Sequence, residues 1–120
     1  MRISELAERA GTSARTLRYY EQHGLLRARR TANGYREYDE VDLRLVREIR
    51  SLLEIGFNLE DTRPFVECLR SGRGSGAECP GSIEVLGRKL TDLDTCIARL
   101  QAVRGRVSRE LAAATELEQE

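Results

Sequence analysis

The residues with the greatest capacity for chemistry in this sequence are arginines near the N-terminus and three cysteines further along the chain. Arginine presents a planar set of donors that matches phosphate oxygens and the edge of guanine, whereas a cysteine thiol binds soft metals or exchanges with disulfides. The arginines are interleaved with tyrosines over residues 13–38. Anion recognition is therefore expected at one end of the chain and thiol chemistry elsewhere.

Positive charge is confined to the N-terminal end. The 120 residues hold 20 basic and 20 acidic side chains, so the whole chain is neutral. Residues 1–36 contain 8 Arg and 3 Glu, a net charge of +5, and residues 37–66 contain 4 Arg and 8 acids, a net charge of −4. One face is expected to meet phosphates, because a protein coated by nucleic acid would be basic throughout.

The first arginines lie on elements that are expected to form a helix-turn-helix. A two-turn helix ends at Gly11, and Thr12 or Ser13 can cap a second helix in which Leu17 and Tyr20 face the core. A helix in the major groove of DNA contacts bases mainly with its first turns. The candidates for DNA contact on this helix, for which a solvated face is the alternative, are Arg15, Thr16, Arg18 and Tyr19.

A basic hairpin is expected next. The pair Asn33-Gly34 favours a type I′ turn because both residues accept positive φ at low cost. Four guanidiniums on so small a ribbon would repel one another without an anionic partner, so the hairpin is interpreted as a wing that contacts DNA, with Arg30 and Arg36 as candidates. The four are Arg27, Arg29, Arg30 and Arg36.

Two more helices are expected before residue 71. Asp39 caps the third helix, with Asp42 at its third position. The fourth helix contains Pro64, which predicts a kink or a late start because proline lacks the backbone donor of a helix interior. The apolar stripe expected to be buried on the third helix is Val41, Leu45, Ile49, Leu52 and Leu53.

A Gly-rich segment over residues 71–81 is expected to be a linker, and a long helix over residues 82–117 follows it. Apolar residues repeat along this helix at 3,4 spacing, which is typical of a coiled coil. Because the chain is small, it has little surface of its own on which to bury the stripe. We therefore expect dimerisation, and the alternative is that the helix folds back on the N-terminal domain. The stripe is Ile83, Leu86, Leu90, Leu93, Ile97, Leu100, Val107 and Leu111.

These elements predict a mainly α protein. Residues 1–70 form a winged helix-turn-helix DNA-binding domain with a helical extension, residues 71–81 form a linker loop that is a possible effector site, and residues 82–117 form the dimerisation helix. There is no nucleophile beside a base and no phosphate-binding Gly loop after a strand, so we do not expect an enzyme. No apolar run is long enough to cross a membrane.

The cysteines leave several alternatives open. Cys79 precedes Pro80 at the start of the long helix, where the helix dipole favours a thiolate, and Cys68 lies eleven residues earlier. The two could form a redox pair, or bind Cu(I), Hg(II) or Zn(II) with a ligand from a partner chain. The alternative is that both thiols are structural and the effector binds elsewhere. Cys96 is interpreted as interface packing, and an odd number of cysteines suits a reducing, cytoplasmic setting.

The sequence resembles the MerR family of bacterial transcription regulators. The matching segments are TLRYYEQHGLL at residues 16–26, NGYREY at residues 33–38 and DLRLVREIRSLLEIGFNLED at residues 42–61, together with the long helix after a short linker. In metal-sensing members a Cys begins the dimerisation helix, as Cys79 does here. Those members also carry Cys or His in a later loop, and nothing after Cys96 matches that.

The resemblance implies a dimer joined by an antiparallel coiled coil that binds a palindromic operator in promoter DNA. It implies that an effector makes the protein kink and undertwist the DNA, so that the promoter elements realign for RNA polymerase. By similarity, Arg18 and Tyr19 in the helix and Tyr35 and Arg36 in the wing contact DNA. The sequence does not identify the effector, for which the candidates are a metal ion or an oxidant sensed through Cys79. The alternative function is an effector-independent architectural or excisionase-like DNA-binding protein.

Overall fold

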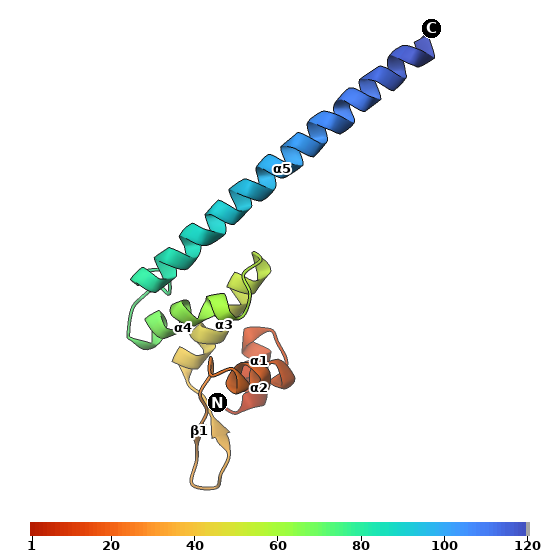
Figure 1. The fold of residues 1–120 in the computed structure, drawn as a ribbon. Helices are drawn as coiled ribbons and strands as arrows, with labels where there is room; N and C mark the ends of the chain where they lie inside the picture. The colour runs from red at the N-terminus through yellow and green to blue at the C-terminus, as the bar shows by residue number, and fades with distance from the viewer. Residues whose placement is uncertain (120) are drawn as a thin grey trace. The chain divides into compact units, whose positions relative to one another are not determined.

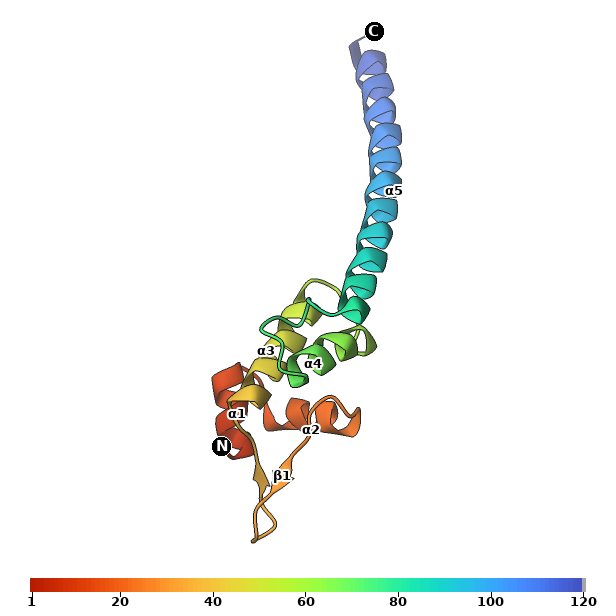
Figure 2. The ribbon, with the colours of Figure 1, turned by 90° about the vertical axis from the view of Figure 1, so that its left-hand side faces the viewer.

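A computed structural model describes residues 1–119, which form two compact units. The first, Met1–Val85, contains four helices, a short 3₁₀ helix, a two-stranded wing and the beginning of a fifth helix; the second consists of the rest of that helix (Figure 1). The mainly α, winged helix-turn-helix architecture predicted from the sequence is confirmed. Within the first unit the wing projects away from the helices, as Figure 2 shows from the side.

The helix-turn-helix consists of α1 (Ile3–Ala10) and α2 (Ala14–Gln22). Between them Gly11 adopts φ 71°, the left-handed conformation that ends a helix, and a Cβ there would meet Arg50 Nη1 at 2.9 Å. Ser13 then caps α2, because its hydroxyl accepts a hydrogen bond from Thr16 N at 3.1 Å. The turn therefore has the tight geometry that sets α2 against α1.

The wing consists of β1 (Arg29–Arg30) and β2 (Arg36–Glu37), an antiparallel pair in which Arg30 faces Arg36. The predicted type I′ turn is wrong. Only Gly34, at φ 81°, has positive φ in the loop, whereas a type I′ turn needs it at both central residues. Thr31 N donates to Tyr35 O at 2.9 Å and closes a three-residue loop, in which Gly34 N donates back to Thr31 O at 2.9 Å.

The core of the first unit is organised around α3 (Glu40–Glu54), which packs against both α1 and α4 (Arg63–Arg70). Because α3 is covered from two sides, its buried arc is wider than a single stripe and includes Leu43 and Val46. Val41 was expected in the stripe, but it lies just outside this arc and is 44% exposed.

Pro64 delays the start of α4. A 3₁₀ turn, Glu60–Thr62, comes first, and Pro64 then lies in the first turn of α4, where the missing backbone donor costs no hydrogen bond. The predicted late start is confirmed. Thr62 is fully buried, and its hydroxyl donates to Leu59 O at 2.6 Å.

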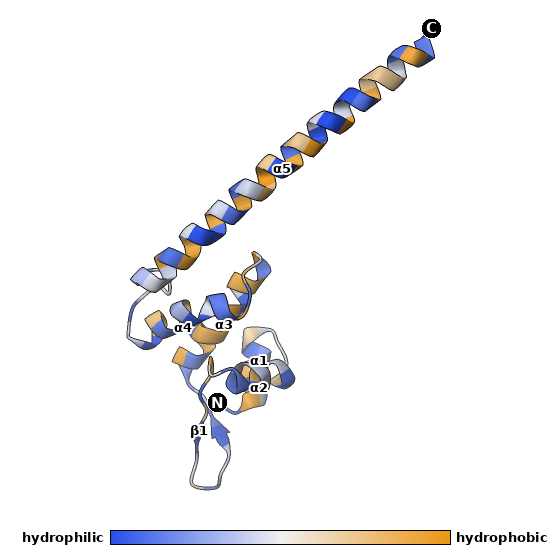
Figure 3. Cartoon of the chain, viewed as in Figure 1, coloured by the Kyte–Doolittle hydropathy of each residue, from blue (hydrophilic) through white to orange (hydrophobic). Residues whose placement is uncertain are grey.

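The long helix α5 spans Pro80–Gln119, so it begins two residues earlier than expected. Only Ser82 and Val85 of its residues are buried within the described chain. Apolar and polar residues alternate along the rest of α5 in Figure 3. The stripe is exposed, with Leu90 at 61%, Ile97 at 51% and Leu111 at 68%. No helix in residues 1–119 has the length and hydrophobicity to cross a membrane.

Candidate nucleic-acid interface

The outer face of α2 carries the side chains predicted to contact DNA. Leu17 and Tyr20 are buried in the core at 0% and 3% exposure, which turns Arg15, Arg18 and Tyr19 to the outside. Within residues 1–119 neither the Arg15 nor the Arg18 guanidinium has an ion-pair or hydrogen-bond partner. These two side chains are therefore available to an external anion.

Thr16 and Tyr19 are more constrained than the two arginines. The Thr16 hydroxyl lies 3.0 Å from the Ser13 hydroxyl at the cap of α2. The Tyr19 ring is 48% exposed and packs on His23, with ring centroids 4.3 Å apart. His23 Nδ1 lies 2.9 Å from Tyr19 O, so the imidazole contacts the backbone at the C-terminal end of α2. Arg63 Nη2 donates a hydrogen bond to His23 O at 2.7 Å. The end of α2 is thus held to α4.

Glu21 on α2 joins the recognition helix to the wing. One of its carboxylate oxygens accepts from Arg36 Nε at 3.1 Å, and the other accepts from the Tyr38 hydroxyl. Burial, together with the hydrogen bond to Glu21, raises the pKa of Tyr38 above its ordinary value. These contacts fix the direction in which the wing leaves the domain.

Not all the wing arginines are available to an external anion. Arg29 pairs with Asp39 at 2.7 Å and Asp42 at 3.4 Å. Arg36 uses its Nε for Glu21. The expectation that these guanidiniums repel one another was incomplete, since carboxylates from neighbouring elements compensate two of the four charges.

A groove of about 370 Å³ lies between the wing and the start of α1. Arg30 Nη1 donates to Gly34 O at 3.0 Å, and the Arg2 guanidinium lies 3.9 Å from the centre of the exposed Tyr35 ring. Arg2 was missed from the sequence, although it contributes to the positive charge counted there. The groove is lined by Arg2, Ile3, Ser4, Arg30, Gly34, Tyr35 and Arg36.

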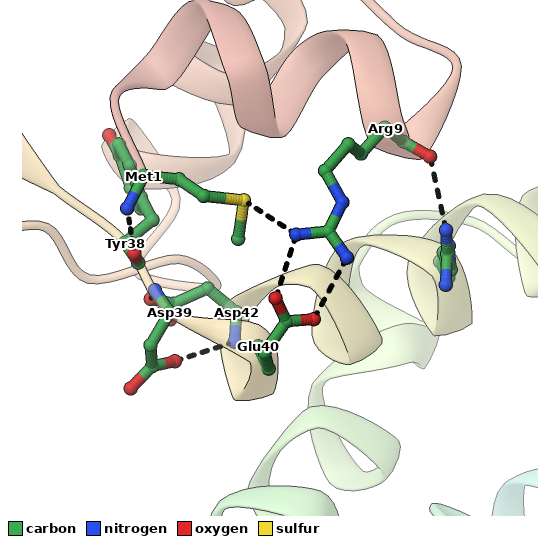
Figure 4. A network of polar contacts seen from close by, with 7 residues as sticks. Met1, Arg9, Tyr38, Asp39, Glu40 and Asp42 are labelled. Carbon is green, nitrogen blue, oxygen red and sulfur yellow. Dashed lines mark hydrogen bonds and ion pairs between the residues drawn. The ribbon is translucent and has the colours of Figure 1, made fainter.

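Polar contacts tie the residues that follow β2 to the N-terminus and to α1 (Figure 4). The N-terminal ammonium of Met1 donates to Tyr38 O at 2.6 Å, and Tyr38 N donates to Met1 O at 2.8 Å. Arg9 forms two hydrogen bonds to Glu40, at 2.7 and 3.1 Å, which lower the pKa of that carboxyl group. The wing is therefore held at its base by both α1 and α2.

Asp39 and Asp42 form a capping box at the start of α3. Asp42 N donates to the Asp39 side chain at 3.1 Å, and Asp39 N donates to the Asp42 side chain at 2.8 Å. The backbone hydrogen bond from Asp42 lowers the pKa of Asp39, and burial raises the pKa of Asp42. The predicted cap is confirmed and directly follows the wing.

The cysteines lie outside this interface. Cys68 on α4 and Cys79, which precedes α5, form a disulfide with Cα atoms 5.8 Å apart. Cys96 is free and exposed on α5. A soft metal needs thiolates, whereas these two sulfurs are bonded to each other, and residues 1–119 bring no three His, Cys, Asp or Glu side chains together around one point. While they are bonded to each other, the sulfurs of Cys68 and Cys79 are not available as thiolate ligands.

Comparisons with known proteins agree with this geometry. The chain matches the model of MerR HTH family regulatory proteins over residues 1–67. It is 33% identical over 104 residues to the HTH-type transcriptional regulator HmrR of Rhizobium leguminosarum bv. viciae, which covers 87% of this chain and 78% of that protein. It is 36% identical over 118 residues to nodulation protein NolA of Bradyrhizobium elkanii, covering 98% of this chain; the chain spans 49% of that relative.

Solved structures also share the fold, among them the following two. One is the transcription regulator PbrR691 from Ralstonia metallidurans CH34 in complex with lead(II), with a TM-score of 0.70 and 27% identity over 89% of this chain and 81% of that one. The other is HiNmlR, a MerR family regulator lacking the sensor domain and bound to promoter DNA, with a TM-score of 0.58 and 27% identity over 84% and 75%. The chain belongs to the MerR family of helix-turn-helix transcription regulators.

Proposed function

We propose that this regulator binds promoter DNA by placing α2 in the major groove and the wing against the flanking backbone. The observation that carries the proposal is the pair of exposed guanidiniums on α2, Arg15 and Arg18, which have no partner within residues 1–119. An arginine in the major groove forms bidentate hydrogen bonds to guanine O6 and N7. Thr16 and Tyr19 flank these arginines and contact the same half-site.

The wing supplies contacts to the DNA backbone. Arg30 lies on β1, and Tyr35 stands in the wing loop beneath Arg2. Arg36 is held by Glu21 through Nε, so it offers only its terminal nitrogens. Backbone contacts fix the register of the protein on the duplex, whereas base contacts choose the sequence. The wing therefore orients α2 rather than reading bases.

The protein acts as a homodimer. The apolar stripe of α5 is exposed along its length, with Leu93 at 45% and Leu100 at 67%, and a second copy is the partner that a 3,4 repeat fits. The family resemblance supports an antiparallel pair. Two copies related by a twofold axis bind two half-sites, so the operator is palindromic. The dimerisation stripe is Ile83, Leu86, Leu90, Leu93, Ile97, Leu100, Val107 and Leu111.

The regulator responds to an effector by distorting its operator, so that the promoter elements realign for RNA polymerase in the cytoplasm. Support comes from the family resemblance and from HiNmlR, which was solved on promoter DNA. The junction around Cys68 and Cys79 is the sensing region, because it joins the DNA-binding helices to the start of α5. The switch in this mechanism is the free energy of deforming the operator, which depends on the DNA sequence.

The test uses the DNA upstream of the protein's own gene. We expect the purified dimer to protect a palindromic segment from nuclease digestion, and Arg18→Ala to weaken binding by about 1 to 3 kcal/mol with relaxed sequence preference. Arg99→Ala, which changes an exposed arginine of α5, is the matched control and leaves affinity unchanged. Equal affinity of Arg18→Ala and the control would remove α2 from the interface.

A further inference from the structure

We propose that Cys68 and Cys79 form a reversible thiol–disulfide exchange site whose substrates are low-molecular-weight disulfides and their thiols. The geometry that carries the proposal is a covalent bridge between α4 and the residue that precedes α5. In a reducing compartment such bridges are usually transient and redox-sensing, whereas permanent structural disulfides belong to oxidising compartments. The reducing compartment and the effect on transcription rest on the proposed function; the exchange chemistry does not.

The two sulfurs differ in access. Cys68 is 2% exposed in the core of α4, and Cys79 is half-buried at the surface end of the loop. A small disulfide can therefore reach Cys79 and not Cys68. Cys79 O accepts from Ser82 N and Ile83 N, which places its thiolate at the N-terminal end of α5, where the helix dipole stabilises negative charge. Cys79 is the attacking residue and Cys68 is the resolving one.

The exchange balances without another reagent. The Cys79 thiolate attacks one sulfur of R–S–S–R, which forms the mixed disulfide and releases one thiolate. The Cys68 thiolate then attacks the Cys79 sulfur, forms the internal disulfide and releases the second thiolate. The two protons of the protein thiols pass to the two leaving thiolates, so one dithiol and one disulfide give one internal disulfide and two R–SH. An excess of R–SH reverses both steps.

The structure also accommodates the reduced state. Cys68 Sγ lies 3.5 Å from Ser75 O, and in the disulfide this is a contact without a proton. After reduction the Cys68 thiol has that carbonyl in place as an acceptor, at a distance that suits a sulfur donor. The buried thiol of the reduced state is therefore not left as an unpaired donor. The pair can therefore cycle without unfolding α4.

Reduction would act on the loop over residues 71–79. The loop is held by Arg44 Nη2, which donates to Gly74 O at 3.0 Å, and by Ser82 Oγ, which donates to Gly76 O at 2.5 Å. Gly76 lies so close to α3 that a Cβ there would meet Glu48 Oε1 at 3.0 Å. The disulfide is the covalent member of this set, so breaking it leaves only single hydrogen bonds and packing.

Reduction of the disulfide would also affect the beginning of α5. Val85 is buried with Leu52, Phe57 and Phe65, so the first turns of α5 are anchored in the first unit. The disulfide adds a tether one residue before Pro80 opens the helix. Oxidation therefore stiffens the segment through which the dimerisation helix is attached to the DNA-binding domain.

The exchange is tested by equilibrating the full-length Cys96→Ser protein anaerobically in buffers of reduced and oxidised glutathione. Acid quenching, alkylation of remaining thiols and intact mass then count free cysteines. We expect a single transition from two labels to none, with half-oxidation between the wholly reduced and wholly oxidised buffers. A disulfide that persists in reduced glutathione alone, or one that never forms in oxidised glutathione, overturns the proposal.

The order of attack is tested with two further variants in the same background. Cys68→Ala is expected to accumulate one glutathione adduct on Cys79, because no resolving thiol remains. Cys79→Ser is expected to stay unmodified, because Cys68 is buried. Adducts on Cys68 instead would overturn the assignment, and Cys79→Ser alone decides this if Cys68→Ala does not fold.

The effect on the junction is tested by amide hydrogen exchange of the Cys96→Ser protein. Amides of residues 71–85 are expected to exchange about tenfold faster after reduction, whereas those of α1 stay unchanged. Equal exchange in both states would show that the bridge does not restrain the junction. None of these three tests uses DNA, so failure to bind an operator would count against the proposed function and leave this site standing.

Discussion

The Tyr38 hydroxyl donates a hydrogen bond to Glu21, 17 residues earlier in the chain and on the recognition helix. Tyr38 is 1% exposed, and its backbone is also bonded to Met1 at the start of α1. One residue at the base of the wing therefore contacts both α2 and the segment that leads into α1. These contacts of Tyr38 explain why a two-residue strand, too short to be stable alone, has a fixed direction beside α2.

Tyr38→Phe should destabilise the domain without emptying its core. The ring is retained, while Glu21 loses one of its two donors and a hydrogen bond to a charged group is lost, at a cost of about 1 to 3 kcal/mol. Urea denaturation followed by circular dichroism measures the change. Tyr35→Phe, at a 54% exposed ring, is the matched control and should leave the midpoint unchanged. A Tyr38→Phe protein as stable as this control would contradict a structural role for the contact with Glu21.

Stability should fall in alkaline solution through the buried tyrosines. Burial raises the pKa of both Tyr38 and Tyr20 above the ordinary value of 10.0. The unfolded chain therefore releases these protons at a lower pH than the native chain, so their contribution is fully present below that value and is lost as pH rises above it. Denaturation at a series of pH values through that region measures the slope. Tyr38→Phe should make the slope shallower, and an unchanged slope would exclude Tyr38 as its source.

Much of the helical framework could be predicted from local patterns. Ser13 caps α2 and Asp39 caps α3 as expected, because a cap depends on residues three positions apart. The partners of Glu21 and the stacking of Arg2 on Tyr35 could not be predicted, because they join residues that are distant in sequence and depend on how the wing packs. The turn type failed for a local reason, since a three-residue loop uses the same Asn-Gly pair differently.

The state of the cysteine pair could not be predicted from the sequence either. The sequence left a redox pair, a metal site and inert thiols as alternatives, because the distance between Cys68 and Cys79 depends on the path of the loop between them. In the structure the loop packs so closely on α3 that a Cβ at Gly76 would meet Glu48 Oε1 at 3.0 Å, and the sulfurs of Cys68 and Cys79 are bonded to each other. Tertiary packing therefore decides between the redox pair, the metal site and the inert thiols, which the sequence alone does not distinguish.

Arg2→Ala should weaken operator binding evenly across sequences. Arg2 lies over Tyr35 at the groove beside the wing, and the proposed function sets the wing against the DNA backbone, so we expect Arg2 to contact a phosphate and not a base. Loss of one phosphate contact lowers the slope of log affinity against log salt by about 1. Titrations at several salt concentrations on the operator and on a scrambled duplex measure it. A selective loss on the operator alone would mean that Arg2 reads bases instead.

Leu93→Asp should dissociate the dimer. Leu93 lies on the exposed stripe of α5, and a carboxylate at a seam position of a coiled coil would be buried without a partner. Sedimentation equilibrium should give a monomer for this variant and a dimer for Thr95→Asp, which adds the same charge to an exposed position off the stripe. A Leu93→Asp dimer would place the interface elsewhere.

Transcription from the operator should follow the redox state of the bridge. If the disulfide stiffens the attachment of α5 to the DNA-binding domain, oxidised and reduced dimers impose different geometry on the same DNA, and their promoter activities should differ at equal occupancy. Reconstituted transcription in reduced and oxidised glutathione measures this, with footprinting to match occupancy. Cys79→Ser should give one activity in both buffers, whereas Cys96→Ser, which keeps the bridge, should respond as the unaltered protein does. Identical activity of the oxidised and reduced dimers, with the disulfide verified by mass, would separate the exchange chemistry at Cys68 and Cys79 from control of the promoter.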